Sequence, residues 1–172
     1  WAFKNDIDGR VRAFLNFKEN LFYRFDPDHD DKTYPCPRTW HMLSKLIKDE
    51  PVSQEDLILV GGTIGQGAGV DFVNFCEVYG KLPSFEEIIS NPTGFKLDRN
   101  DIAIKWAIST MISDKMEPDN IKQCLEALDY IGIEFAHVAV ASAAGRLGPS
   151  IAANPIAAKW IIEYSKKYHM NY

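Results

Sequence analysis

The chain has 172 residues, of which 46% are apolar, and this is enough for one or two domains with a real core. Acidic residues outnumber basic ones by 24 to 19, which gives a net charge of −5 with both signs interspersed. This pattern argues against a nucleic-acid-binding surface, which needs a basic stripe facing the phosphates.

The cysteines and the hydropathy pattern predict a cytoplasmic protein. Cys36, Cys76 and Cys124 lie far apart without CxxC spacing, so they indicate neither a disulfide framework nor a zinc site. No window approaches the roughly 20 apolar residues of a membrane-spanning helix, and no signal segment opens the chain. We therefore expect no membrane insertion. Because the chain begins at Trp1 rather than at methionine, we also expect it to be a piece of a longer protein.

Apolar residues recur at spacings of three and four, which predicts an all-α fold. The first helix is expected to run out at residues 25–27, with an apolar face that contains Ile7, Val11, Phe14, Leu15 and Phe22. Prolines and aspartates predict a loop over residues 26–37. A second helix is expected to begin at Pro37, a favoured first-turn residue, and to bury Trp40, Leu43, Leu46 and Ile47.

Local capping signals predict the later helices. Ser53 with Asp56 opens a third helix, glycines interrupt it over residues 61–69, and Ser84 with Glu87 forms a capping box for a short helix. The turn over residues 91–94 is the predicted domain boundary, which separates residues 1–91 from a C-terminal helical extension over residues 95–172. Helices are expected there around 104–112, 121–128, 135–144 and 156–168, the last with Asn154 as its N-cap.

The glycines over residues 61–69 follow an apolar run and could belong to a strand, a phosphate loop and a helix. A P-loop needs GxxxxGK[ST]; Gly62 and Gly67 have this span, but Ala68 stands where the lysine is required. The dinucleotide fingerprint GxGxxG also fails, and no alternation of strands and helices surrounds the segment. We therefore interpret it as a joint between two helices with close backbone packing.

Three aspartates in the loop predicted over residues 26–37 match part of a calcium-binding motif. Asp26, Asp28 and Asp30 reproduce the first three ligand positions of a calcium-binding loop. The sixth position is Asp31 instead of glycine, and the twelfth is Pro37 instead of a bidentate glutamate. We interpret this segment as a solvated acidic turn and expect no metal site.

A hydrolytic enzyme on a helical fold is the least favoured class of function. The GxSxG motif that carries a nucleophilic serine does not occur. The sequence also identifies no general base that could activate one of the cysteines. His29 and His41 have no partners at metal-ligand spacing. His137, in an apolar helix, is the one faint candidate for a catalytic group, and such a histidine is more often a packed core residue.

Arg38 is the candidate site residue on physical grounds. It follows Pro37 in the first turn of a helix, where unpaired backbone N–H groups and the helix dipole already make a positive end. A cation there costs about 0.3 to 1 kcal/mol unless an anion is near, and helix N-termini are anion sites. The alternative without a ligand is that the side chain of Arg38 points away from the helix end and forms an ion pair with an aspartate of the loop, namely Asp26, Asp28, Asp30 or Asp31. General physical arguments by themselves favour this alternative.

The same region resembles the C-terminal part of MoxR-type AAA+ ATPases. The resemblance runs from Val11-Arg12-Ala13-Phe14-Leu15 through Phe25-Asp26-Pro27 to Tyr34-Pro35-Cys36-Pro37-Arg38-Thr39-Trp40. It continues through Val60 to Ala68 and Leu82-Pro83, and more faintly to Trp160. Cys36 departs from the small hydroxyl residue more usual at its position. The resemblance implies that residues 1–91 are a helical lid and that Arg38 is the sensor-2 arginine, which reaches the γ-phosphate of ATP.

The resemblance also implies what this chain does not contain. It has no Walker A lysine and no apolar run ending in Asp-Glu, so we expect a P-loop domain that binds ATP and Mg²⁺ to precede Trp1 in the full-length protein. The isolated chain is then expected to hold neither ligand. The implied partners are this P-loop domain, neighbouring subunits of a ring, and a client protein, in some relatives one with a von Willebrand factor A domain.

A second function class remains open, namely a stand-alone helical module that binds other proteins and has no nucleotide role. A GxxxxGK[ST] motif upstream of Trp1 would favour the lid, and its absence would favour the module.

Overall fold

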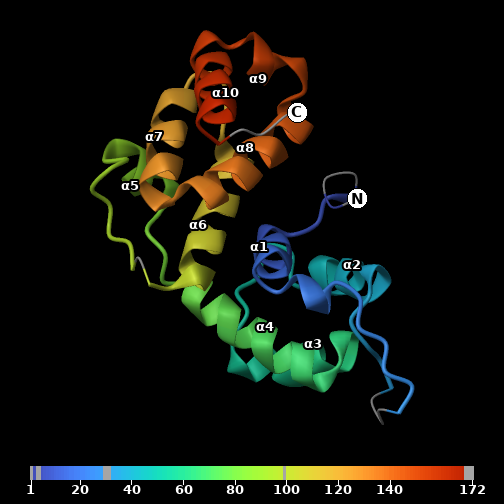
Figure 1. Ribbon diagram of the computed structural model, residues 1–172. Coiled ribbons are helices and arrows are strands. Elements are labelled where there is room, and N and C mark those ends of the chain that lie inside the picture. The colour runs from blue at the N-terminus through green and yellow to red at the C-terminus, as the bar shows by residue number, and fades with distance from the viewer. Residues whose placement is uncertain (1, 3–4, 29–31, 99, 169–172) are drawn as a thin grey trace. The chain divides into compact units, whose positions relative to one another are not determined.

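The computed structural model describes residues 2, 5–28, 32–98 and 100–168 (Figure 1). Ten α-helices and two short 3-10 helices make up the regular structure of these ranges, and no strand occurs in them. The predicted all-α fold is therefore confirmed. None of the helices in the described ranges combines the length and the apolar character that a membrane crossing requires.

The chain forms two compact units. The first contains residues 1–82 and 100–107, and the second contains residues 83–99 and 108–172. The turn over residues 91–94, predicted as the boundary, therefore lies inside the second unit. The reason is that the short helix before this turn, α5 (Phe85–Ser90), packs against α7 (Ile121–Ile131) of the second unit. Helix α6 (Ile102–Lys115) contributes residues to both units.

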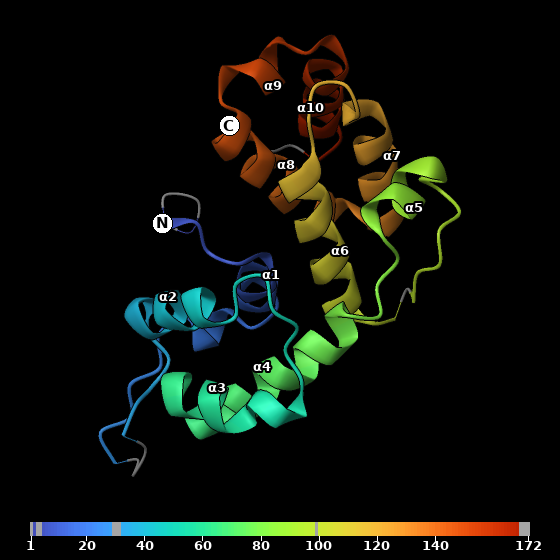
Figure 2. The same cartoon turned by 180° about the vertical axis from the view of Figure 1, so that it is seen from behind.

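In the described residues, the first unit contains four complete α-helices, two 3-10 helices and the start of α6. Its elements are α1 (Gly9–Phe17), η2 (Glu19–Leu21), α2 (Pro37–Leu46), η3 (Gln54–Asp56), α3 (Leu57–Ile64) and α4 (Gln66–Tyr79). Helices α3 and α4 lie side by side, as both views show (Figure 1, Figure 2). The predicted starts at Pro37 and after Ser53 are confirmed, although Ser53 caps the 3-10 helix η3 that leads into α3.

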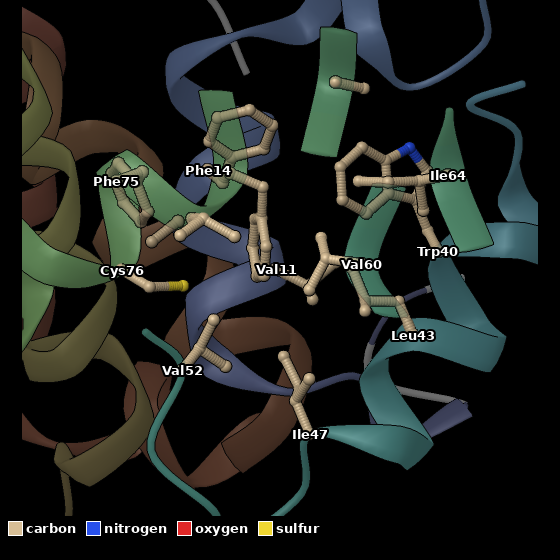
Figure 3. Packing of buried hydrophobic residues seen from close by; sticks show 14 of the residues in the cluster. Val11, Phe14, Trp40, Leu43, Ile47, Val52, Val60, Ile64, Phe75 and Cys76 are labelled. Atoms are coloured by element: carbon tan, nitrogen blue, oxygen red, sulfur yellow. The ribbon is translucent and has the colours of Figure 1, made fainter. Parts of the chain in front are cut away.

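Aromatic rings fill the core of the first unit (Figure 3). The ring of Phe14 lies with its centroid 5.6 Å from that of Trp40, 5.3 Å from Phe72 and 5.5 Å from Phe75. Phe14, Trp40 and Phe72 are completely buried. Helices α1, α2 and α4 are therefore held by one shared aromatic cluster, which fixes the start of α2 against its neighbours.

Two apolar residues predicted for this core are exposed instead. Phe22 is exposed because α1 ends at Phe17, well before residues 25–27, and Leu21 of η2 takes the buried position. Leu46 is half exposed, whereas Ser44 of the same helix is buried. Ser44 can be buried because its hydroxyl accepts a hydrogen bond from the backbone N–H of Asp8, at 2.8 Å.

The glycine segment forms the predicted joint between two helices. Leu57–Ile64 is helical rather than a strand, and Gly65 joins α3 to α4 with a φ of 92°, a conformation that favours glycine. A methyl group added at Gly69 would lie 2.6 Å from the Cα atom of Gly61. The two helices therefore meet backbone to backbone, as interpreted from the sequence.

The second unit contains α5, α7, α8 (Ile133–Leu147), α9 (Pro149–Ala153), α10 (Pro155–Tyr168) and the last part of α6. The predicted capping box is confirmed, since the backbone N–H of Ser84 donates to Glu87 Oε2 at 2.7 Å and the backbone N–H of Glu87 donates to Ser84 Oγ at 3.2 Å. Asn154 caps α10, as predicted, by accepting from the backbone N–H of Ile156 at 3.0 Å. The five-residue helix α9 was not predicted.

Candidate functional site

Arg38 is the second residue of α2 and is exposed at the end of a well-packed helix. Pro37 occupies the first helical position, where its missing N–H group leaves no donor unsatisfied. Trp40, two residues further on, is completely buried and donates its indole N–H to the backbone oxygen of Leu21 at 2.8 Å. The backbone that carries Arg38 is therefore anchored in the core of the first unit.

Hydrogen bonds hold the loop before α2 to itself and to the neighbouring helices. The backbone N–H of Arg24 donates to the carbonyl oxygen of Pro35 at 2.9 Å, and Thr33 Oγ1 donates to the carbonyl oxygen of Thr63 at 2.9 Å. The hydroxyl of Thr39 accepts from the backbone N–H of Cys36 at 2.9 Å. These bonds connect the described part of the loop to α2 and α3, so the N-terminus of α2 has a defined position.

The guanidinium group of Arg38 forms no ion pair with any carboxylate of the described residues. The predicted alternative of a pair with Asp26 or Asp28 is therefore not found; Asp26 instead accepts the backbone N–H of Asp28 at 3.1 Å. Asp30 and Asp31 lie outside the described residues. The first turn of α2 contains no acidic residue, so within this turn the positive side chain of Arg38 adds to the positive end of the helix dipole.

Cys36 is the N-cap residue of α2 and is half-buried. Burial alone would raise the pKa of its thiol, but hydrogen bonds from Thr39 and the backbone of Arg38, with the charge of Arg38, outweigh burial and lower the pKa. A thiol therefore lies beside Arg38, and its pKa is lowered first by the hydrogen bonds with Thr39 and then by the backbone and charge of Arg38.

A cavity of about 370 Å³ lies next to this loop, where the loop passes the joint between α3 and α4. Arg24, Phe25 and Tyr34 line it from the loop, and Gly67 and Ala68 line it from the first turn of α4. Sequence reasoning did not find these residues as a site. The signal that could have found them is the run of aromatic residues beside Arg24 and the Tyr34-Pro35 pair in an otherwise polar loop.

The remaining candidates from the sequence do not come together as a catalytic site. Among the described residues, no group of three histidine, cysteine or acidic side chains could hold a metal ion. His137 is half-buried and stacks on Tyr164, with ring centroids 5.6 Å apart and an angle of 11° between the rings. His29 lies outside the described residues, and His41 is half-buried on α2.

No protein-family profile, curated protein or solved structure matches this chain. The site is therefore interpreted from its own residues and geometry.

Proposed function

We propose that the first unit acts as the helical lid of an AAA+ ATPase of the MoxR type and contributes Arg38 to ATP hydrolysis by the full-length protein. The observation that carries the proposal is the position of Arg38: an exposed guanidinium, without a described carboxylate partner, on the first turn of an anchored helix. The resemblance of the surrounding sequence and the all-α fold support it.

The chemistry of Arg38 suits a phosphate contact. A guanidinium group is planar, stays charged at all working pH values, and can donate two parallel hydrogen bonds to phosphate oxygens. Because Trp40 anchors the helix, the side chain extends from a fixed base. A phosphate that met this group would also meet the positive end of the α2 dipole, which turns the unfavourable position of Arg38 into a favourable one.

The residues of this chain fit one part of a nucleotide site. Arg38 can hold the terminal phosphate of ATP, whereas the described residues contain no group of three histidine, cysteine or acidic side chains that could hold a metal ion. When bound, ATP supplies the phosphoryl group and Mg²⁺ neutralises charge on it. We propose that both are held by a P-loop domain outside this chain and that the role of Arg38 is to orient the phosphate and stabilise its developing charge.

The proposed partners follow from the same resemblance. They are the P-loop domain of the same protein, neighbouring subunits of a ring, and a client protein, for which a von Willebrand factor A domain is one candidate. Movement of the lid with the state of the nucleotide would transmit work to the client. We place the protein in the cytoplasm, for which the three free cysteines are the support.

Substitution of Arg38 in the full-length protein tests the proposal. We expect Arg38→Ala to lower steady-state ATP turnover about ten- to a hundredfold, because a hydrogen bond to a charged group contributes about 1.5 to 3 kcal/mol. We expect the melting temperature to change little, because Arg38 is exposed and forms no ion pair with a carboxylate of the described residues. Arg38→Lys should keep more activity than Arg38→Ala but less than the wild type, since lysine lacks the planar guanidinium group that donates two parallel hydrogen bonds.

Lys45→Ala is the matched control for Arg38→Ala. Lys45 is an exposed cation in the last turn of the same helix, so its removal changes the net charge equally at the opposite end of α2. This variant should keep wild-type turnover. Wild-type turnover in a folded Arg38→Ala protein would refute the role of Arg38, and equal losses in both variants would show only a general effect of charge.

The isolated 172-residue chain provides a second test. We expect it neither to hydrolyse ATP nor to bind it tightly, because one arginine cannot replace the phosphate loop, its lysine and Mg²⁺. ATP turnover by the purified chain that persists through independent purification protocols would overturn the lid assignment.

The alternative function, a protein-binding helical module without a nucleotide role, is favoured by exposed apolar residues on the first unit. Ile58 of α3 is 86% exposed, Tyr23 is 61% exposed and Phe25 is 56% exposed. A surface of this kind fits a partner protein as well as a neighbouring domain. A GxxxxGK[ST] motif about 150 to 200 residues upstream of Trp1 would favour the lid, and its absence would favour the module.

A further inference from the structure

The cavity beside the loop is a second candidate site in the first unit, and Arg38 is not among the residues that line it. Its volume of about 370 Å³ lies within the range of about 300 to 1,000 Å³ that is common for small-molecule sites. Its walls come from two segments, the loop with Arg24, Phe25 and Tyr34, and the helix joint with Gly67 and Ala68.

One part of the wall is apolar and aromatic. The rings of Phe25 and Tyr34 meet edge to face, with centroids 5.0 Å apart, and Leu21 and Ile64 are buried residues that also line the cavity. Aromatic walls of this kind contact planar apolar ligands over a large area at little cost in side-chain entropy.

Another part of the wall is positive. The guanidinium group of Arg24 forms no ion pair with any carboxylate of the described residues. Gly67 and Ala68 belong to the first turn of α4, whose backbone N–H groups have no acceptor within the helix. No atom lies within 4 Å of the position that a side chain would take at Gly67, so this part of the backbone is open to a ligand.

One acidic residue also lines the cavity. Asp26 is engaged in its own turn, because its Oδ1 atom accepts the backbone N–H of Asp28 at 3.1 Å. This bond turns one carboxylate oxygen toward the backbone but does not remove the charge of Asp26. Among the described residues that line the cavity, Arg24 is the one cation that can meet an anion. We propose that this cavity binds a small planar anion, a carboxylate or phosphate group attached to an aromatic ring, with Arg24 on the anion and Phe25 and Tyr34 on the ring.

A nuclear magnetic resonance titration of the isotope-labelled 172-residue chain tests this proposal. The probes are benzoate for a carboxylate, phenyl phosphate for a phosphate, and benzyl alcohol as a neutral ring of similar size. We expect saturable shifts of the backbone signals of Arg24, Gly67 and Ala68 with at least one anion, at a Kd of roughly 1 mM or below. Benzyl alcohol should bind at least about tenfold more weakly.

Two pairs of variants locate the contacts. Arg24→Gln should weaken binding of the anion about tenfold or more, whereas Lys45→Gln, which removes an exposed cation outside the cavity, should leave it unchanged. Phe25→Ala should weaken binding severalfold, because it removes one of the two aromatic rings that contact the ring of the ligand. Ile58→Ala is its control, because Ile58 is an exposed apolar residue that does not line the cavity.

Arg38→Ala separates this site from the nucleotide proposal and should leave probe binding unchanged. The cavity proposal is overturned if no probe gives saturable shifts at these positions. It is also overturned if benzyl alcohol binds as tightly as the anions, or if Arg24→Gln has no effect on the anions. None of these results bears on ATP turnover, so the two proposals fail independently.

Discussion

Cys36 differs from the other two cysteines in both exposure and charge environment. Its thiol is half-buried with a lowered pKa, whereas Cys76 and Cys124 are buried. Burial raises the pKa of Cys76 to about 12, with partial compensation by the charge of Arg10, and raises that of Cys124 to about 12 as well. The thiolate, which is the reactive form, is therefore available chiefly at Cys36.

We predict that iodoacetamide alkylates Cys36 first in the folded protein. A lowered pKa means that the thiolate fraction rises earlier with pH, so the rate at Cys36 should reach half of its maximum below pH 9.0, the ordinary value. Cys76 and Cys124 should react at comparable rates only after unfolding. Mass spectrometry of peptides from a time course at several pH values measures these rates, and a midpoint for Cys36 at or above pH 9.0 would contradict the assignment.

Helices α3 and α4 depend on a single close approach of their backbones. Gly69 packs against Gly61 so closely that a methyl group at residue 69 would lie 2.8 Å from the backbone nitrogen of Gly61. Because the neighbour is backbone rather than a flexible side chain, the helices would have to move apart. The loop that carries Arg24 is tied to this pair through the bond from Thr33 to Thr63, so the spacing of the two helices also sets the cavity.

We predict that Gly69→Ala lowers the free energy of unfolding by about 1 to 3 kcal/mol or more, as overpacking does. Gly62→Ala is the control within the same pair of helices, because a methyl group there meets no atom within 4 Å. It should stabilise the protein by up to about 1 kcal/mol through higher helix propensity. Urea unfolding of the two variants measures the difference, and equal stabilities would show that the helices separate without cost.

The two compact units each have a core of their own. Leu43 is completely buried in the first unit and Leu128 is completely buried in the second. In the second unit, Arg146 of α8 donates to the backbone oxygens of Ser113 and Met116 and so caps the end of α6. Contacts of this kind stabilise one unit without involving the other core.

We predict that Leu43→Ala and Leu128→Ala each cost about 2 to 5 kcal/mol, because each leaves a cavity in a packed core. The loss should be local: amide hydrogen exchange should speed up mainly in the first unit for Leu43→Ala and mainly in the second for Leu128→Ala. An equal loss of protection across both units in either variant would show that the chain unfolds as one cooperative body.

The sequence alone was sufficient where structure depends on neighbours within one or two turns. The all-α fold, the start of α2 at Pro37, the capping box of Ser84 and Glu87 and the N-cap at Asn154 were predicted for this reason. So was the joint at the glycines, because their backbone freedom is a property of the residue itself. The place of Arg38 in the first turn of a helix was predicted for the same reason, whereas its role as a site residue stays a prediction.

The tertiary structure decided what depends on residues far apart in the chain. Leu21 is buried and Phe22 exposed because α1 ends at Phe17, and the backbone oxygen of Leu21 accepts the indole N–H of Trp40, 19 residues away. Ser44 is buried because Asp8, 36 residues away, donates to it. The boundary between the units and the cavity with Arg24 likewise arise from packing of distant segments. Periodicity and capping signals carry no information on such pairings, since they report only which face of a helix is apolar and where it ends.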